Sequence, residues 1–213
     1  MKTYDMSLLT KKIYESTAQL FTLQTLREHL DINKSGSLFK IVNRLLESGV
    51  LVKIERNKYS LKNYSCNEFT LANFIYEPSY VSFESALSYH GILSQFPYEI
   101  TSATLGQTRS KKFSGKEYGY YHLKKSLFWG YIKVDNYLIA DKEKALADQI
   151  YLTSKGIKKI HLEEYDLSLI NKLKFKTYIL KYPQTNLGHI FKDDGGNILV
   201  INLHIMVLTA QQT

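Results

Sequence analysis

Apolar and polar positions alternate at helical spacing through the first third of the chain. Met6, Leu9 and Ile13 recur every three or four residues, which predicts a helix over residues 5–16. A second helix is predicted over residues 22–30. Thr22 is its candidate N-cap, because a threonine hydroxyl can accept a hydrogen bond from an amide of the first turn.

A third helix is predicted over residues 37–48, after a polar turn, with either Ser35 or Ser37 as its N-cap. Gly49 follows, as expected for the left-handed residue that closes a helix. One face has the spacing of a buried stripe and consists of Leu38, Ile41, Val42, Leu45 and Leu46. The opposite face is polar and consists of Lys40, Asn43, Arg44 and Glu47.

A basic hairpin follows the third helix: residues 50–54 and 59–61 are strand-like and flank a turn. Helix, turn, helix and hairpin in this order predict a winged helix-turn-helix, in which the last helix enters the major groove of DNA. An isolated polar helix face would indicate only solvation, so the prediction depends on all these features together. The predicted DNA-binding residues are Lys34, Ser35, Ser37, Lys40, Asn43, Arg44, Lys53, Arg56, Asn57 and Lys58.

A polar connection at residues 62–68 separates this region from the rest, so we predict one domain over residues 1–64 and a second over residues 65–213. In the second domain, helices are predicted at 70–76, 82–89, 141–155 and 166–173, and strands at 100–105, 118–123, 127–134 and 198–201, the last after a turn at 193–196. The predicted fold class is α+β: an N-terminal winged helix-turn-helix plus a C-terminal mixed α/β domain with largely antiparallel strands.

Charge is unevenly distributed. The chain has a formal net charge of +8, from 28 basic and 20 acidic residues. Residues 1–64 contain 11 basic and 6 acidic residues, a net charge of +5, which leaves +3 for the remainder. The concentration of positive charge in the predicted DNA-binding domain favours a polyanionic partner.

Cysteine content and hydropathy indicate a cytoplasmic protein. Cys66 is the only cysteine and fits a reducing compartment. The N-terminus lacks the apolar run of a signal peptide. The longest apolar stretch, residues 198–208, is far shorter than the ~20 residues of a membrane span, so we expect no membrane partner.

The best candidates for catalysis are His122 and the acidic residues Asp141, Glu143 and Asp148. Carboxylates beside lysines can hold a metal ion and a phosphate. However, a D…E-x-K nuclease motif would need a lysine where Ala145 stands. Helix capping by the carboxylates and hydrogen bonding by His122 are better interpretations. We therefore expect no enzymatic activity.

The motifs of zinc sites, phosphate-binding loops and dinucleotide folds do not occur in the sequence, so no metal or cofactor is predicted. Six cationic residues form a second basic patch that could extend a DNA footprint, contact an RNA or simply be solvated. They are Arg109, Lys111, Lys112, Lys116, Lys124 and Lys125.

Several motifs follow one another in the second half: PSYVSFESALSYHG at residues 78–91, TSAT at 101–104, YGYYHL at 118–123 and ADKEKALADQIY at 140–151. Over about residues 5–155 the chain resembles the AbiEi family of type IV antitoxins, from bacterial abortive-infection systems. Beyond about residue 160 the resemblance fades. The matching motif residues are Tyr80, Ser82, Ala86, Leu87, Gly91, Thr104, His122, Glu143, Lys144 and Asp148.

The resemblance implies a winged helix that binds inverted repeats in its own promoter and represses it, joined to an antitoxin domain. It also implies a neighbouring nucleotidyltransferase-like toxin, which the antitoxin counters without a stable complex. The protein would be a monomer when free, with two copies on DNA. Two alternatives remain: a transcription factor with a ligand-sensing C-terminal domain, and a nucleic-acid-processing enzyme that uses His122 and the segment 141–148.

Overall fold

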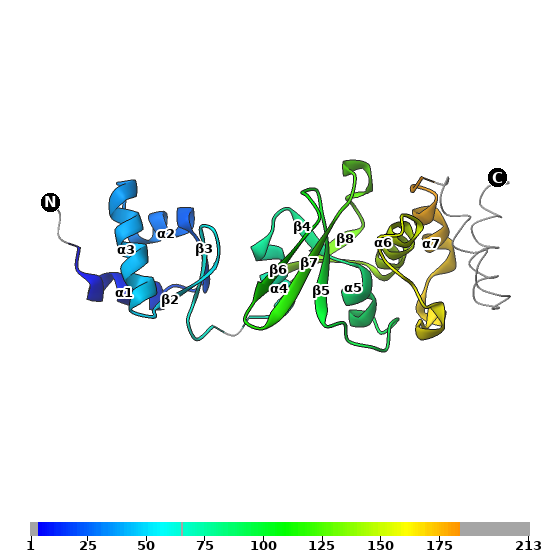
Figure 1. Ribbon diagram of the computed structural model, residues 1–213, viewed down its shortest axis with the longest axis horizontal. Helices are drawn as coiled ribbons and strands as arrows, with labels where there is room; N and C mark the ends of the chain where they lie inside the picture. The colour runs from blue at the N-terminus through cyan, green and yellow to red at the C-terminus, as the bar shows by residue number, and fades with distance from the viewer. Residues whose placement is uncertain (1–3, 65, 184–213) are drawn as a thin grey trace. The chain divides into compact units, whose positions relative to one another are not determined.

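The computed structural model describes residues 4–64 and 66–183. The turn predicted at 193–196 and the strand predicted at 198–201 lie outside this range. The fold is α+β, and the chain divides into two compact units, Met1–Asn67 and Glu68–Thr213 (Figure 1). The division falls inside the connection predicted at residues 62–68.

The N-terminal unit combines helices with a small sheet of order β1-β3-β2, in which both strand pairs are antiparallel. The sequence did not predict β1, because three residues are too few to show an alternating pattern. The elements in chain order are α1 (Met6–Tyr14), β1 (Leu20–Thr22), α2 (Leu23–Leu30), α3 (Ser35–Glu47), β2 (Leu51–Glu55) and β3 (Lys58–Leu61).

Helix ends in this unit follow local hydrogen bonding. Thr22 accepts from the amide of Thr25 at 3.1 Å, and the Thr25 hydroxyl accepts from the amide of Thr22 at 2.9 Å, so the predicted N-cap is confirmed. The prediction of a serine cap on α3 is wrong. Lys34 is the N-cap residue, with no side-chain cap, and Ser35 instead accepts from Nη2 of Arg27 at 3.0 Å. Gly49 has the predicted left-handed backbone, with φ of 70°.

One core holds the N-terminal unit together. The stripe predicted on α3 is buried at four of its five positions, and Leu46 is partly buried. Burying a side chain of this size contributes about 1.5–3 kcal/mol. The α3 residues therefore fix which face of the helix remains for solvent. The core consists of Leu9, Ile13, Phe21, Leu26, Leu30, Ile32, Leu38, Ile41, Val42, Leu45, Val50, Leu51 and Tyr59.

The second unit contains a six-stranded sheet of order β6-β7-β5-β4-β9-β8. Its elements are α4 (Glu68–Ile75), β4 (Ser79–Val81), α5 (Phe83–Tyr89), β5 (Glu99–Thr104), β6 (Arg109–Phe113), β7 (Lys116–His122), η1 (Lys125–Leu127), β8 (Tyr131–Val134), β9 (Tyr137–Ala140), α6 (Lys142–Ser154), η2 (Leu162–Glu164), η3 (Leu167–Leu169) and α7 (Lys172–Ile179).

The sheet is mixed. Three neighbouring pairs are antiparallel, whereas β5–β7 and β4–β9 are parallel, which qualifies the prediction of largely antiparallel strands. The basic segment 109–113, for which no strand was predicted, is a strand paired with β7. The helix predicted at 166–173 is two elements, because the carboxylate of Asp166 holds a short 3₁₀ turn and Asn171 caps α7.

Helices cover both faces of this sheet (Figure 1). The hydroxyl of Tyr120 donates to the carbonyl of Ala72 in α4 at 2.7 Å on one face. On the other face, the hydroxyl of Tyr80 donates to Asp148 in α6 at 3.0 Å. Helix α7 packs against α6, so α6 lies between other elements and is buried from Glu143 to Leu152. Among the described residues, no helix has both the length and the apolar character needed to cross a membrane.

Candidate functional site

Helix α3 presents a polar face opposite its buried stripe. Lys40, Asn43 and Arg44 are exposed on it, and Lys34 is exposed at its start. Ser37 is partly exposed. Glu47 is exposed on the same face. The other exposed residues are cations and an amide, which are the side chains that pair with guanine and adenine edges or with phosphates.

Ser35 has a second role that the sequence did not reveal. Its hydroxyl accepts from Arg27 of α2, so it joins the two helices across their turn. The Nε of Arg27 is buried and has no hydrogen-bond partner among the described residues. Ser35 therefore helps to fix the angle at which α3 follows α2.

The β2–β3 hairpin carries the remaining predicted residues. Lys53, Arg56 and Asn57 are exposed, and Lys58 is partly exposed. Asn57 has a left-handed backbone, with φ of 60°, and its carbonyl accepts from the amide of Leu23 at 2.9 Å. This bond ties the turn of the hairpin to the start of α2. The basic tip is therefore held at a fixed place relative to the helices of its own unit.

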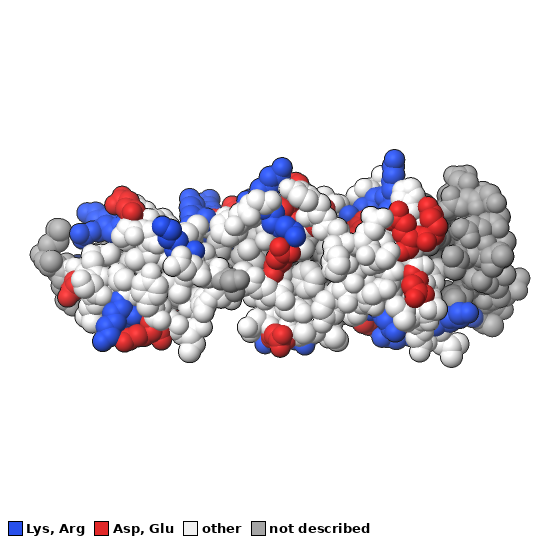
Figure 2. Space-filling model, turned by 90° about the horizontal axis from the view of Figure 1, so that it is seen from below, with Lys and Arg blue, Asp and Glu red and all other residues white. Residues whose placement is uncertain are grey.

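The charge of the N-terminal unit is not segregated on the face that Figure 2 shows. Lysine and arginine side chains there are interspersed with acidic ones. On the face shown in Figure 2, the cationic side chains of this unit therefore form no uniform patch. The distinguishing feature of the candidate site is the combination of α3 and the hairpin tip.

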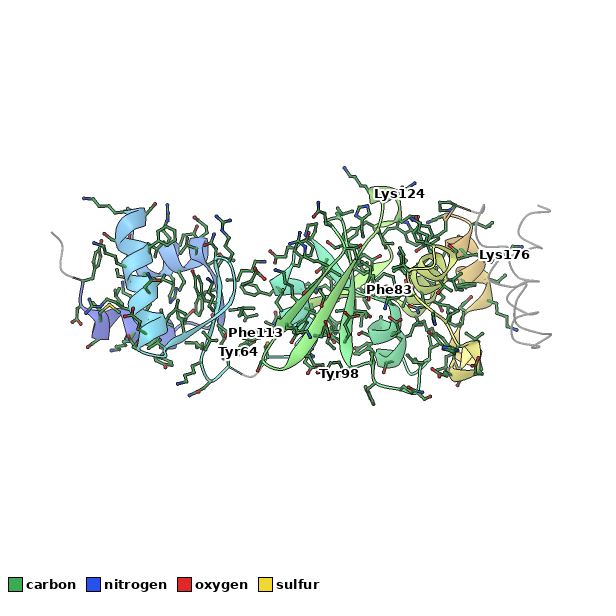
Figure 3. The ribbon with its side chains drawn as sticks, in the orientation of Figure 1. Tyr64, Phe83, Tyr98, Phe113, Lys124 and Lys176 are labelled. Atoms are coloured by element: carbon green, nitrogen blue, oxygen red, sulfur yellow. The ribbon has the colours of Figure 1, made fainter. Side chains whose placement is uncertain are left out.

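Four residues of the second basic patch lie on the paired strands β6 and β7, and the other two follow β7. Arg109 lies 4.4 Å from the ring centre of Tyr76, Lys112 is 3.8 Å from Glu117 and Lys116 is 3.0 Å from Glu68. Lys111 is partly exposed on β6. Lys124 and Lys125 are exposed at η1, where Figure 3 shows Lys124 pointing outward. Neighbouring carboxylates reduce the attraction that this patch could exert on a polyanion.

Half of the motif residues have local structural roles. Ala86 and Leu87 are fully buried, and Gly91 has φ of 72°. Thr104 donates to the carbonyl of Pro78 at 2.8 Å and accepts from the amide of Gly106 at 3.0 Å. His122 is exposed, with Nδ1 2.9 Å from the carbonyl oxygen of Gly106. His122 therefore forms a local hydrogen bond and lies in β7, away from the residues described next.

Four other motif residues meet around one buried carboxylate. Asp148 accepts from the hydroxyl of Tyr80 at 3.0 Å and from that of Ser82 at 2.8 Å through Oδ2. Through Oδ1 it accepts from the hydroxyl of Tyr182 at 2.7 Å and from the ammonium group of Lys144. We call these five residues the Asp148 centre. Each is at most 2% exposed, so the centre lies in the interior of the second unit.

Ser82 is the N-cap residue of α5, but its side chain makes no cap bond, because its hydroxyl donates to Asp148. The next residue, Phe83, begins α5 with φ of 57°. Its side chain is fully buried inside the second unit (Figure 3). A left-handed backbone at a non-glycine residue costs about 1–2 kcal/mol. Packing of the Phe83 ring against Tyr121, at 5.4 Å between centres, helps to offset this cost.

Aromatic rings surround the ammonium group of Lys144. The centres of Trp129, Tyr182 and Tyr80 lie 4.8, 5.1 and 5.6 Å from Nζ. Burial lowers the pKa of Lys144, and the carboxylate of Asp148 opposes that shift. Burial also raises the pKa of Tyr80 and Tyr182 well above the ordinary value, and Asp148 adds to the effect. The tyrosines are therefore donors and Asp148 is the acceptor.

The carboxylates at the start of α6 interact with α7. Asp141 accepts from the amide of Lys144 at 2.9 Å, which confirms it as the N-cap, and lies 3.2 Å from Lys174. Glu143 is 1% exposed, accepts from the amide of Asn171 at 3.0 Å and lies 3.0 Å from Lys174. Capping thus explains Asp141, whereas Glu143 and Asp148 connect α6 to neighbouring elements. Burial would raise the pKa of Glu143, but Asn171 and Lys174 outweigh it and lower the pKa.

Two members of this region were missed by sequence reasoning. Tyr182 and Trp129 lie outside the motifs, and no periodic pattern links them to α6. The side chains of the Asp148 centre are buried and hydrogen-bonded to one another. Among the described residues, no group of three or more His, Cys, Asp or Glu side chains could hold a metal ion.

Comparison with known proteins adds no assignment. No protein-family model matches the chain, and no curated protein sequence matches it either.

Proposed function

We propose that the N-terminal unit is a winged helix-turn-helix that binds double-stranded DNA. The order of its elements supports this, because a helix, a short strand, two helices and a hairpin that pairs with the strand make up such a domain. Helix α3 would enter the major groove, and the β2–β3 hairpin would be the wing against a phosphate or the minor groove.

The polar face of α3 carries the proposal. Lys40, Asn43 and Arg44 stand exposed within five residues, and burial of the opposite stripe keeps them on one side. The helix has 13 residues and is about 20 Å long, and the major groove is about 12 Å wide. Several base pairs are therefore within reach along the length of the helix.

We further propose that the protein represses its own promoter at inverted repeats, with one copy on each half-site. Half-sites would lie about 34 Å apart, one turn of DNA. The second unit would be the antitoxin of a type IV pair and would counter a nucleotidyltransferase-like toxin encoded nearby. These roles depend on the AbiEi-like motifs. Four motif residues meet in the Asp148 centre, which supports a shared structural role for them.

A mobility-shift experiment with the promoter fragment tests DNA binding. The double variant Lys40→Ala/Arg44→Ala should abolish the shifted band and derepress a reporter, because both cations are lost from α3. The matched control, Lys11→Ala/Lys12→Ala, removes two cations from α1 and should retain the shift. Circular dichroism checks that both variants are folded. Full repression by the α3 variant would disprove the assignment.

A growth assay tests the antitoxin role separately. Full-length protein with Lys40→Ala/Arg44→Ala should still rescue cells that express the neighbouring toxin from an independent promoter. Failure of wild-type protein to rescue them would refute the antitoxin role, whatever the DNA result.

A further inference from the structure

A pocket of about 400 Å³ opens in the second unit where two strands of the sheet separate. Strands β4 and β9 are paired only at Val81 and Ile139. Continuing this parallel register would bring Ser79 opposite Tyr137, and both residues line the pocket. The amide of Leu138 donates to Oδ1 of Asn73 in α4 at 2.6 Å. The pocket therefore begins where the hydrogen bonding of the sheet is replaced by a side chain.

Aromatic residues form much of the wall. Phe128, Tyr131 and Tyr137 line the pocket, and the rings of Phe128 and Tyr131 are 5.4 Å apart at an edge-to-face angle of 62°. Tyr137 is held by an edge contact with Phe69 at 5.4 Å. These contacts fix the rings before any ligand arrives. Aromatic walls of this kind suit a planar ligand, since stacking on them is worth about 1–3 kcal/mol per base.

Two residues that line the pocket each carry a buried polar atom without a hydrogen bond to any described residue. Nδ2 of Asn73 and Oγ of Ser79 are buried without a partner among the described residues. An unsatisfied buried polar group costs about 1–3 kcal/mol, so a ligand that supplied the missing partner would recover part of that cost. The Oδ1 of Asn73 already accepts from Leu138, which orients the amide and leaves its donor side for another group. Lys133 and Asn136 are exposed residues that also line the pocket.

We propose that this pocket binds a nucleoside-sized heteroaromatic molecule. The base would lie against the aromatic wall, and its ring nitrogen or carbonyl would accept from Asn73, while Ser79 supplies a second hydrogen bond. Asn136 and Lys133 would contact the polar sugar side. The volume lies within the range of about 300–1,000 Å³ found for small-molecule sites.

Binding is tested on the full-length protein with adenosine, guanosine, cytidine and uridine as separate probes. Isothermal titration at about 1 mM probe gives the affinity. Changes in the NMR chemical shifts of backbone amides locate the site. The test variant is Ser79→Ala and the matched control is Ser102→Ala. Ser102 is also fully buried with an unpartnered hydroxyl among the described residues, but it lies in β5 and does not line the pocket.

We expect at least one nucleoside to bind and to shift the amides of Ser79 and Tyr137. Ser79→Ala should weaken binding by about fivefold or more, because one hydrogen bond is lost, and Ser102→Ala should leave it unchanged. Both variants should fold, since each removes only an unsatisfied hydroxyl. Absence of binding for all four probes, or equal affinity of the two variants, would overturn the proposal. These outcomes do not depend on DNA binding.

Discussion

Tyr182 donates a hydrogen bond of 2.7 Å to Asp148, which lies 34 residues earlier in the chain. The same hydroxyl accepts from Lys144 at 2.5 Å. This pair attaches the segment after α7 to the middle of α6. We expect Tyr182→Phe to lower the free energy of unfolding by about 1.5–3 kcal/mol, because a bond to a buried charge is lost. Urea unfolding measures it, with the exposed Tyr98→Phe as a control that should change little.

Lys144 and Asp148 form an ion pair with both side chains fully buried. Lys144→Met should therefore destabilise the second unit by about 3–5 kcal/mol, since it leaves a buried carboxylate without its cation. The exposed Lys172→Met is the control. The double variant Lys144→Met/Asp148→Leu should recover part of the loss. Equal melting temperatures for Lys144→Met and the control would contradict the pairing.

The stability of the second unit should depend on pH through Glu143. Its pKa is lowered from the ordinary value of 4.5 in the folded protein. A carboxyl with a depressed folded pKa contributes stability above its unfolded pKa, and loses it as pH falls through the folded pKa. Wild-type melting temperature should therefore fall more steeply below about pH 4.5 than that of Glu143→Gln. The exposed Glu164→Gln should follow the wild-type curve.

Substitution by alanine should change the stability of the N-terminal unit in opposite directions at the two glycines near the ends of α3. Gly36, in the first turn of α3, has open space around the position that a Cβ would take, with no atom within 4 Å, so Gly36→Ala should stabilise by about 0.5–1 kcal/mol. Gly49 has φ of 70°, and Gly49→Ala should destabilise by about 1–2 kcal/mol. Thermal unfolding measures both changes in stability. If both variants were stabilised, or both destabilised, the ends of α3 would be misassigned.

The salt dependence of DNA affinity shows whether the cations of α3 or those of β6 contact DNA. Each phosphate contact contributes about 0.9 to the slope of log affinity against log salt. We expect Lys40→Ala/Arg44→Ala to reduce the slope by as much as about 1.8. Lys111→Ala/Lys112→Ala should leave it unchanged, because Lys112 already lies beside Glu117. A reduced slope for the second variant would place β6 on the DNA.

Local patterns predicted the helices of this protein better than its strands. The stripe of α3 predicted its buried face, and Thr22 and Asp141 were recognisable caps. The strand β1 escaped because it is too short for its alternation to be distinctive, and the parallel pairing of β5 with β7 has no local signal. The observed start of α3 differs from the predicted one, and Ser35, a predicted cap, hydrogen-bonds to Arg27 instead.

The two candidate sites also differ in how far local sequence patterns predict them. Exposure of Lys40 and Arg44 follows from helical spacing alone. The Asp148 centre does not, because sequence analysis identified four of its members as motif residues without predicting their contact, and missed Tyr182. A helix buried on all sides shows no polar stripe, so the sequence pattern of α6 did not predict that it is buried from Glu143 to Leu152.

The bonds to Asp148 also bear on the order in which the chain folds. They join it to Tyr80 and Ser82, which are 68 and 66 residues away. Contacts this distant in sequence close large loops and slow folding. In the N-terminal unit, the hydrogen bonds of Thr22 and Ser35 span only three and eight residues. We therefore expect the N-terminal unit to fold first on the ribosome and the second unit to become native only after Tyr182 has emerged.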